Sequence, residues 1–315
     1  MFSREMNPGL GRAGRFIPKL EALEDRCCPS TVSLNSQTHL LTLTGDASNS
    51  TIVVRDDGHG DVQVYGLAGA TAAHPLKYAG VTAIEMDSKT GNDHLDYALT
   101  GALTKPEKLT LNLGRGADQV KLDFTKGVSA ASLGVSINGV GGGGQEVTAL
   151  FGAITNTNLQ LTAHLGDGWN HFTALLNGDL TGSAKMDVNV VGGKSTDGIS
   201  VEAKGGIAAS ARLSVEANGG AGDNTVHADY SGKLAGALAI TEQGGVGWEW
   251  LESVVNLTAG STGSVVDHLI GGTGTDMLIL SLQNSASHLK SLDAAISHVS
   301  RTSGVSHTSN VRVVT

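Results

Sequence analysis

Apolar and polar residues alternate over short stretches of this chain, and the alternating stretches recur at a nearly constant interval. Each stretch follows a glycine-rich turn, and the polar residue two places before its first apolar residue serves as an anchor for counting. The anchors are Asp93, Asp118, Gln145, Asn170, Asp197, Asn224, Glu249 and Asp276, and successive anchors are 25 or 27 residues apart. Such a regular repeat predicts a stack of equivalent supersecondary units.

The residues after each anchor have the period of two that is typical of a half-buried strand. Positions two and four beyond the anchors hold Leu95 and Tyr97, Val120 and Leu122, Val147 and Ala149, Phe172 and Ala174, Ile199 and Val201, Val226 and Ala228, Leu251 and Ser253, and Leu278 and Leu280. All of these except Ser253 are apolar or tyrosine, and mostly polar residues separate them. We therefore expect one face of each strand to be buried and the other to face water.

A second strand precedes most of the turns. Apolar pairs stand nine and seven residues upstream of five anchors: Ile84 and Met86, Leu109 and Leu111, Leu161 and Ala163, Val188 and Val190, and Val215 and Ala217. The units anchored at Gln145, Glu249 and Asp276 depart from this phase, which predicts loops of different length there. Each unit is thus a strand, a glycine turn, a second strand and a return loop of about ten residues.

Such a unit cannot bury its apolar face alone, so successive units must stack and share one core. The pattern predicts an all-β fold, a parallel β-solenoid (β-helix-like) of about eight coils of 25–27 residues. We expect residues 1–30 to form a leader or targeting segment without fixed structure, 31–80 an N-terminal cap of β-hairpin character, 81–282 the solenoid and 283–315 a C-terminal cap.

The open ends of a solenoid invite edge-to-edge aggregation unless they are covered. In the C-terminal cap, Leu289, Leu292, Ile296 and Val299 recur at helical spacing after serine residues that suit a helix N-cap. This spacing predicts a short amphipathic helix over the last coil. The final residues 310–315, NVRVVT, are expected to add a strand.

Composition supports many short strands and narrows the choice of partners. Glycine occupies 44 positions while aromatic residues make up 4% of the chain, which favours strands joined by tight turns. The net charge of −9 is spread along the sequence and argues against nucleic-acid binding. No apolar run reaches the roughly 18 residues of a membrane-spanning helix. The two cysteines, Cys27 and Cys28, are adjacent and cannot staple the body of the chain.

Two readings of the glycine turns stay open. Asp, Asn and Gln at a stacked corner can hydrogen-bond nearby backbone amides, which is a purely structural role. However, the stretch GGTGTDMLI (271–279) resembles the calcium loop of hemolysin-type (RTX-like) repeats. That resemblance implies Ca²⁺ as a cofactor, with Asp93, Asp118, Asp197, Asp223 and Asp276 as candidate ligands. The body departs from that family because its motif occurs once per coil rather than every nine residues.

The N-terminal stretch LEALEDRCCPS (20–30) resembles a leader of large exported surface proteins in planctomycete bacteria. In those proteins the leader reads roughly L-E-x-L-E-x-R, then two variable residues, then P-[ST], and precedes repetitive β-rich bodies. The resemblance covers about a tenth of the chain. It implies export to the cell surface or the extracellular space.

The histidine and tryptophan residues that could bind a metal ion or a ligand are scattered along the sequence. His94, His171 and His227 occupy outward strand positions, and no metal-binding histidine spacing occurs. Trp169 and Trp248 each stand directly before an anchor, where they could stack on sugar rings, although filling space beside glycine is the simpler interpretation.

No constellation of converging carboxylates is apparent in the sequence. We therefore expect a non-catalytic, exported structural or adhesive module of the cell surface. Its expected partners are other surface proteins or polysaccharide. A carbohydrate-binding or carbohydrate-active β-helix protein, of lyase or glycosidase type, is the alternative.

Overall fold

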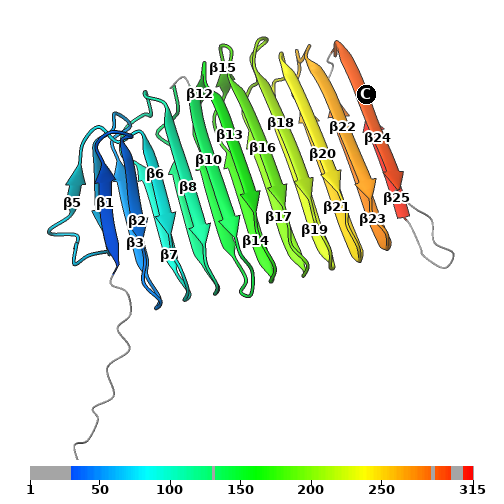
Figure 1. Cartoon of the computed structure of the whole chain (residues 1–315). Coiled ribbons are helices and arrows are strands. Elements are labelled where there is room, and N and C mark those ends of the chain that lie inside the picture. The colour runs from blue at the N-terminus through cyan, green and yellow to red at the C-terminus, as the bar shows by residue number, and fades with distance from the viewer. Residues whose placement is uncertain (1–29, 130–131, 285–287, 299–307, 315) are drawn as a thin grey trace, which may run out of the picture.

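The computed structural model describes residues 30–129, 132–284, 288–298 and 308–314, and these residues contain strands and no helix. The strands stack along one axis, and from residue 81 onward they follow chain order toward the C-terminal end of the rod (Figure 1). No helix in the described part of the chain is long and apolar enough to cross a membrane. The predicted leader, with Cys27 and Cys28, lies outside the described residues except for Ser30.

Two long sheets form the two broad faces of the rod. The first sheet contains, in spatial order, β1 (Thr31–Asn35), β2 (Leu40–Thr44), β6 (Ala83–Asp87), β8 (Glu107–Leu113), β10 (Ser132–Gly139), β13 (Asn158–His164), β16 (Lys185–Val191), β18 (Arg212–Asn218), β20 (Ala237–Gln243), β22 (Ser264–Gly271) and β24 (Ser291–His298). The strands of this sheet alternate in sequence with those of the second sheet, so that each coil contributes one strand to each face.

The second sheet contains, from the opposite end, β25 (Thr308–Val314), β23 (Thr275–Asn284), β21 (Trp248–Leu257), β19 (Asn224–Gly232), β17 (Asp197–Lys204), β14 (Asn170–Leu176), β11 (Glu146–Phe151), β9 (Gln119–Phe124), β7 (His94–Leu99), β3 (Thr51–Asp56), β4 (Val62–Tyr65) and β5 (Leu76–Tyr78). Equivalent residues of consecutive coils pair side by side. For example, Val147 of β11 lies between Val120 of β9 and Phe172 of β14.

The parallel β-solenoid is therefore confirmed, and its eight predicted coils run from β6 and β7 to β22 and β23. Each parallel ladder also continues by one strand at both ends, because β2 and β3 pair in parallel with β6 and β7. At the other end, β24 and β25 pair in parallel with β22 and β23, so the expected C-terminal strand is present.

All sixteen residues predicted two and four places beyond the anchors are buried, with at most 4% of their surface exposed. The five upstream pairs are buried as well. Within the core, the rings of Tyr97, Phe124 and Phe151 follow one another along the rod with centroids 5.3 and 5.2 Å apart. Phe124 and Phe151 are register partners in adjacent coils and stack in one column, whereas Tyr97 is paired with Leu122 and contacts Phe124 from the neighbouring column.

A short third ladder closes the core opposite the glycine turns. It pairs single apolar residues of consecutive return loops, in the order Leu103, Val128, Ile154, Leu180, Ile207 and Leu234. Only β12 (Ile154–Thr155) and β15 (Leu180–Thr181) are long enough there to count as strands. All six residues are buried, so the return loops also contribute to the core.

The predicted change of phase is wrong for two of the three coils. In the coil of Gln145 the turn is one residue longer, and Val135 and Ile137 take the inward places. In the coils of Glu249 and Asp276 the phase is kept, but one inward position in each holds a carboxylic acid. Glu242 and Asp267 are both fully buried at these positions.

The predicted C-terminal helix is wrong for the described residues, because Ser291–His298 is strand β24. Leu292 and Ile296, with Ala294 between them, also fit a period of two, and Ala294 and Ile296 pack against the core. The edge of β22 offers unpaired backbone groups to this segment, which favours a strand over an isolated helical turn. Val299 lies outside the described residues.

Residues 31–80 contain both solenoid and antiparallel strands. β1 pairs antiparallel with β2, and β4 pairs antiparallel with both β3 and β5. Since β2 and β3 also pair in parallel with the next coil, the solenoid begins within this segment. β1, β4 and β5 lie at the end of the stack (Figure 1).

Glycine columns at the turns allow consecutive coils to approach. A Cβ atom at Gly245 would lie 1.2 Å from the carbonyl oxygen of Gly220, and one at Gly272 would lie 1.9 Å from that of Gly245. The obstructing atoms belong to backbone that is fixed by both sheets, so they cannot move aside. Glycine at these places is thus a condition for the coil spacing.

We expect the substitution Gly245→Ala to lower the free energy of unfolding by about 3 kcal/mol, because the added methyl group forces two coils apart. Gly134→Ala is the matched control, since a Cβ there meets nothing within 4 Å. Thermal unfolding followed by circular dichroism compares the two variants. Equal melting temperatures for both would contradict the proposed role of the glycine column.

Candidate functional site

The turns that join the first sheet to the second form one corner of the rod, which we call the glycine corner. It comprises residues 88–93, 114–118, 140–145, 165–170, 192–197, 219–224, 244–249 and 272–276. Every predicted calcium ligand and the tryptophans noted in the sequence lie at this corner. The anchors face the inside of the corner, and the residues just before them face water.

The buried anchors form a hydrogen-bonded ladder along the rod. In each step the side-chain oxygen of one anchor accepts a hydrogen bond from the backbone N–H one coil earlier: Asp93 Oδ1 from Ser50 (2.6 Å), Asp118 Oδ1 from Asp93 (2.9 Å), Gln145 Oε1 from Asp118 (3.2 Å), Asn170 Oδ1 from Gln145 (3.0 Å), Asp197 Oδ1 from Asn170 (3.0 Å) and Asn224 Oδ1 from Asp197 (2.8 Å). A single oxygen is all that each step requires. This explains why amide and carboxylate residues alternate freely in the column.

Several anchors also hold their own turn in place. Asp197 Oδ2 accepts the N–H of Gly193 at 2.6 Å, and Asn170 Nδ2 donates to the carbonyl oxygens of Gly166 and Gly168. At Glu249, Oε1 accepts the N–H of Gly245. Asn170 and Asp197 therefore tie together the turn of their own coil and the backbone of the preceding coil.

The structure does not gather the five predicted calcium ligands around one point. Asp93, Asp118, Asp197 and Asp276 are buried in different coils of the ladder. Asp223 points to water one residue before its anchor, and its Oδ1 accepts the N–H of Trp248 at 3.0 Å. Within the described part of the chain, no three His, Cys, Asp or Glu side chains are arranged to hold a metal ion.

Asp93 and Asp118 are the one pair of candidate ligands that are anchors of adjacent coils. Asp93 Oδ2 and Asp118 Oδ2 are buried and have no hydrogen-bond partner among the described residues. Burial raises the pKa of Asp93 and raises that of Asp118 to about 6. This pair thus carries charge that is poorly compensated by its surroundings.

A second pair of acids lies inside the core near the C-terminal end and was missed in the sequence. Asp267 Oδ2 accepts a hydrogen bond from Ser253 Oγ at 2.8 Å, whereas Asp267 Oδ1 and both oxygens of Glu242 have no partner among the described residues. Burial raises the pKa of Glu242 well above its usual range and raises that of Asp267 to about 6. Their spacing from the anchors matched the inward positions of other coils and was the available signal.

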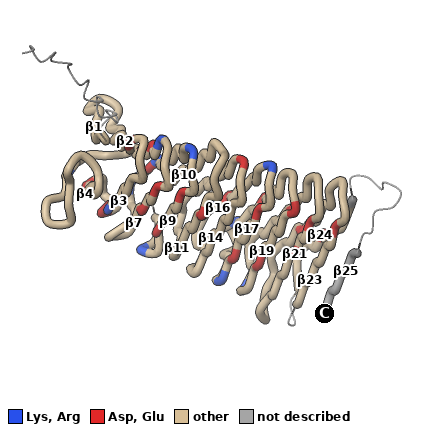
Figure 2. The backbone as a smooth tube through the Cα atoms, turned by 90° about the horizontal axis from the view of Figure 1, so that it is seen from below, with Lys and Arg blue, Asp and Glu red and all other residues tan. Residues whose placement is uncertain are grey.

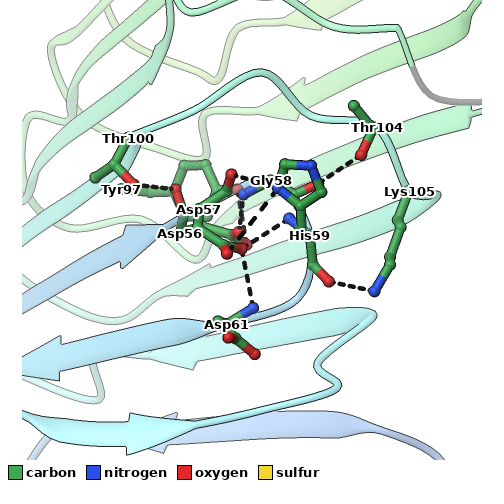
Figure 3. Close-up of polar contacts among 9 residues, drawn as sticks. All are labelled: Asp56, Asp57, Gly58, His59, Asp61, Tyr97, Thr100, Thr104 and Lys105. Atoms are coloured by element: carbon green, nitrogen blue, oxygen red, sulfur yellow. Dashed lines mark hydrogen bonds and ion pairs between the residues drawn. The ribbon is translucent and has the colours of Figure 1, made fainter.

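At the N-terminal end, the turn between β3 and β4 is fixed to the next coil by polar contacts (Figure 3). Asp57 Oδ1 accepts the N–H groups of His59 and Asp61, while Lys105 Nζ donates to the His59 carbonyl oxygen. Beneath the turn, Asp56 Oδ1 accepts the N–H of Gly58 at 2.6 Å. These contacts satisfy the turn internally and explain its acidic sequence without a ligand.

Below this turn a buried tyrosine bridges two acids. The Tyr97 hydroxyl donates to the carboxylate of Glu107, 3.1 Å from either oxygen, and lies 3.4 Å from Asp56 Oδ2. Burial raises the pKa of Asp56 and of Glu107, and the charge of Asp56 adds to the effect on Glu107. One shared proton therefore suits this trio better than two negative charges.

The predicted outward histidines lie on the outer face of the second sheet. His94 and His171 are exposed, and His227 is half-buried between Asp229 (Nε2 to Oδ2, 2.9 Å) and Glu252 (Nδ1 to Oε2, 3.7 Å). A hydrogen bond to Asp229 raises the pKa of His227. Elsewhere Lys and Arg positions are scattered among Asp and Glu positions along the described rod (Figure 2).

The three tryptophans of the chain are all exposed beside the ladder. The exposed fraction is 78% for Trp169, 39% for Trp248 and 36% for Trp250. The interpretation that Trp169 fills space beside glycine is wrong, because most of its surface is in water. Trp250 was missed, although its outward position two residues after Trp248 could have identified it.

Searches of family models, of curated proteins and of solved structures found no match to this chain.

The buried acids predict that the C-terminal core loses stability as pH rises. Asp267 has a raised pKa in the folded state, so its contribution is fully present below pH 4 and is lost as pH rises through about 6. We expect Asp267→Asn to unfold like the wild type at pH 4 and to be more stable by on the order of 3 kcal/mol at pH 7.5. Chemical denaturation at both pH values measures the difference.

Glu216→Gln removes an exposed carboxylate from the same sheet and serves as the control, for which no gain at pH 7.5 is expected. If Asp267→Asn were no more stable than the wild type at pH 7.5, the result would show that the surroundings of Asp267 do not disfavour its charged form.

Proposed function

We propose that this chain is a non-catalytic, exported structural or adhesive module of the cell surface. The observation that carries the proposal is the anchor ladder, in which the six anchors from Asp93 to Asn224 each accept a hydrogen bond from the backbone of the preceding coil. Residues that looked like a site in the sequence thus serve to build a long, regular rod. The leader resemblance of residues 20–30 supports export.

The geometry of the coils suits a spacer or a display surface. Coils of a parallel solenoid are about 4.8 Å apart, so the eight central coils extend the chain by about 40 Å with both faces exposed. Backbone hydrogen bonds run along this axis and resist bending between coils. We also propose that β1, β4 and β5 protect the N-terminal edges of the two sheets, where they pair antiparallel.

A carbohydrate-binding or carbohydrate-active protein is the alternative function, and one observation favours its binding form. Three exposed tryptophans, two at the glycine corner and Trp250 directly beside it, offer flat apolar surfaces to a ligand. For catalysis, His227 and Asp229 are a candidate base and acid, with Nε2 and Oδ2 2.9 Å apart. Formation of reducing or unsaturated sugars from a panel of polysaccharides would favour the enzyme over the structural module.

Surface labelling of intact source cells tests the main proposal. We expect antibodies raised against residues 81–282 to label unbroken cells, and a membrane-impermeant amine reagent to modify the exposed Lys194 and Lys204 before lysis. A cytosolic protein of the same cells must stay unlabelled in the same sample. Labelling that requires lysis would overturn the assignment to the cell surface.

Calcium binding is proposed only for the adjacent pair Asp93 and Asp118, whose free buried oxygens can be compensated by a proton or by a cation. We expect millimolar Ca²⁺ to raise the melting temperature at pH 8, relative to EDTA, and to have less effect at pH 5, where protons compete. The double variant Asp93→Asn and Asp118→Asn should lose the response. Identical melting curves in Ca²⁺ and EDTA at pH 8 would remove the hypothesis.

A further inference from the structure

The tryptophans of this chain are placed against the usual preference of the residue. Tryptophan is on average strongly buried in proteins, yet the core described above contains none, and Trp169, Trp248 and Trp250 all face water. Val140 and Val246, exposed by 71% and 61%, lie at the same glycine corner. Exposed apolar side chains gathered at one corner mark a binding surface rather than random scatter.

The aromatic residues form two groups at equivalent places in different coils. Trp169 and His171 belong to the coil of Asn170, whereas Trp248 and Trp250 belong to the coil of Glu249, three coils further along. The rings of Trp248 and Trp250 meet edge to face, with centroids 6.4 Å apart and an interplanar angle of 89°. Three coil spacings separate the two groups by about 14 Å.

Small side chains occupy the same places in the two coils between the groups. Gly198 and Thr225 stand between His171 and Trp250 in the ladder of paired residues. Thr196 and Asp223 take the place of the tryptophan before the anchors Asp197 and Asn224, and both are exposed. Along the axis of the rod, the coils of Asn170 and Glu249 therefore present aromatic side chains, and the two coils between them present small or polar ones.

This arrangement suits a polysaccharide better than a protein partner. A stable protein interface buries about 800 Å² per partner around a continuous apolar centre, but here hydroxyl groups and a carboxylate interrupt the apolar surface. Sugar rings present an apolar face of C–H groups and a rim of hydroxyls. An indole can stack on the face, while Thr196, Asp223 and Thr225 can hydrogen-bond the rim.

Charge narrows the class of polysaccharide. The chain has a net charge of −9, and Asp223 is exposed between the aromatic groups. The nearby Lys194 is already paired with Asp167 at 3.2 Å. Because an acidic polysaccharide would be repelled here, a neutral one is favoured.

We propose that Trp169, Trp248 and Trp250 form the adhesive surface of the rod and bind a neutral polysaccharide that lies along the axis across the four coils anchored from Asn170 to Glu249. This inference rests on the adhesive form of the proposed function. The rigid coil spacing sets the distance between the two aromatic groups before the ligand arrives. Binding therefore requires little reorganisation of the protein.

Tryptophan fluorescence reports on this surface directly, because the full chain has no tryptophan elsewhere. Titration with a soluble neutral β-glucan should give a saturable change in emission, and polygalacturonate should give none. Affinity should rise steeply once a β-glucan oligosaccharide is long enough to span about 14 Å and reach both groups.

Calorimetric titration of variants with the same glucan locates the site. Trp169→Ala and Trp248→Ala should each weaken binding by about tenfold, while Trp250→Phe should retain it. Leu292→Ala removes an exposed apolar side chain from the first sheet and should bind like the wild type. Melting curves confirm that each variant is folded.

The outcomes separate the inference from the function on which it rests. Equal binding by the wild type and both alanine variants would overturn the tryptophan surface and leave an adhesive role intact. Absence of binding to any neutral polysaccharide, or capture of a protein partner through the same residues, would also overturn it. In that case surface labelling of cells still decides whether the rod is a surface module.

Discussion

Backbone pairing between consecutive coils is the constraint on which the rest of this structure depends. Parallel strands at a spacing of about 4.8 Å bring equivalent residues of every coil into columns, as with Val120, Val147 and Phe172. The side chain of each residue therefore lies next to the equivalent side chains of the two neighbouring coils, rather than in a varied environment. Columns of glycine, of polar anchors and of apolar side chains are the direct result, and each column tolerates only a narrow range of chemistry.

The two acids in the C-terminal core show what happens when a column is broken. Glu242 and Asp267 stand where other coils have apolar residues, and Ser253 satisfies only one of their oxygens. A buried carboxyl group without partners favours its protonated form. The stability of the coils around β20 and β22 consequently depends on pH. The N-terminal trio of Asp56, Tyr97 and Glu107 avoids part of this penalty by sharing hydrogen bonds.

The sequence was sufficient for the repeat, the inward strand positions and the parallel stacking, since all three follow from the spacing of anchors and the period of two. It was insufficient wherever one pattern had two physical explanations. The polar residue Glu242 at an inward position resembled a shift of phase. The spacing of Leu292 and Ile296 fitted both a helix and a strand, and in the structure this segment forms a strand because it pairs with the edge of β22. The direction of Trp169 depended on which side of the turn its backbone faced, a property that residue types alone do not encode.

The same columns that limit the core also organise the surface. On a rod of fixed coil spacing, outward residues three coils apart keep a constant separation, as Trp169 and Trp248 do, without any loop to position them. Binding surfaces on loops lose affinity to the entropy of ordering, whereas here Asn170 and Glu249, the anchors beside the tryptophans, already hydrogen-bond the backbone of their turns. The buried polar column thus has a second consequence besides stability, because its hydrogen bonds hold the corner on which the aromatic residues are displayed. Weakening an anchor such as Asn224 should therefore disturb the surface above it as well as the fold.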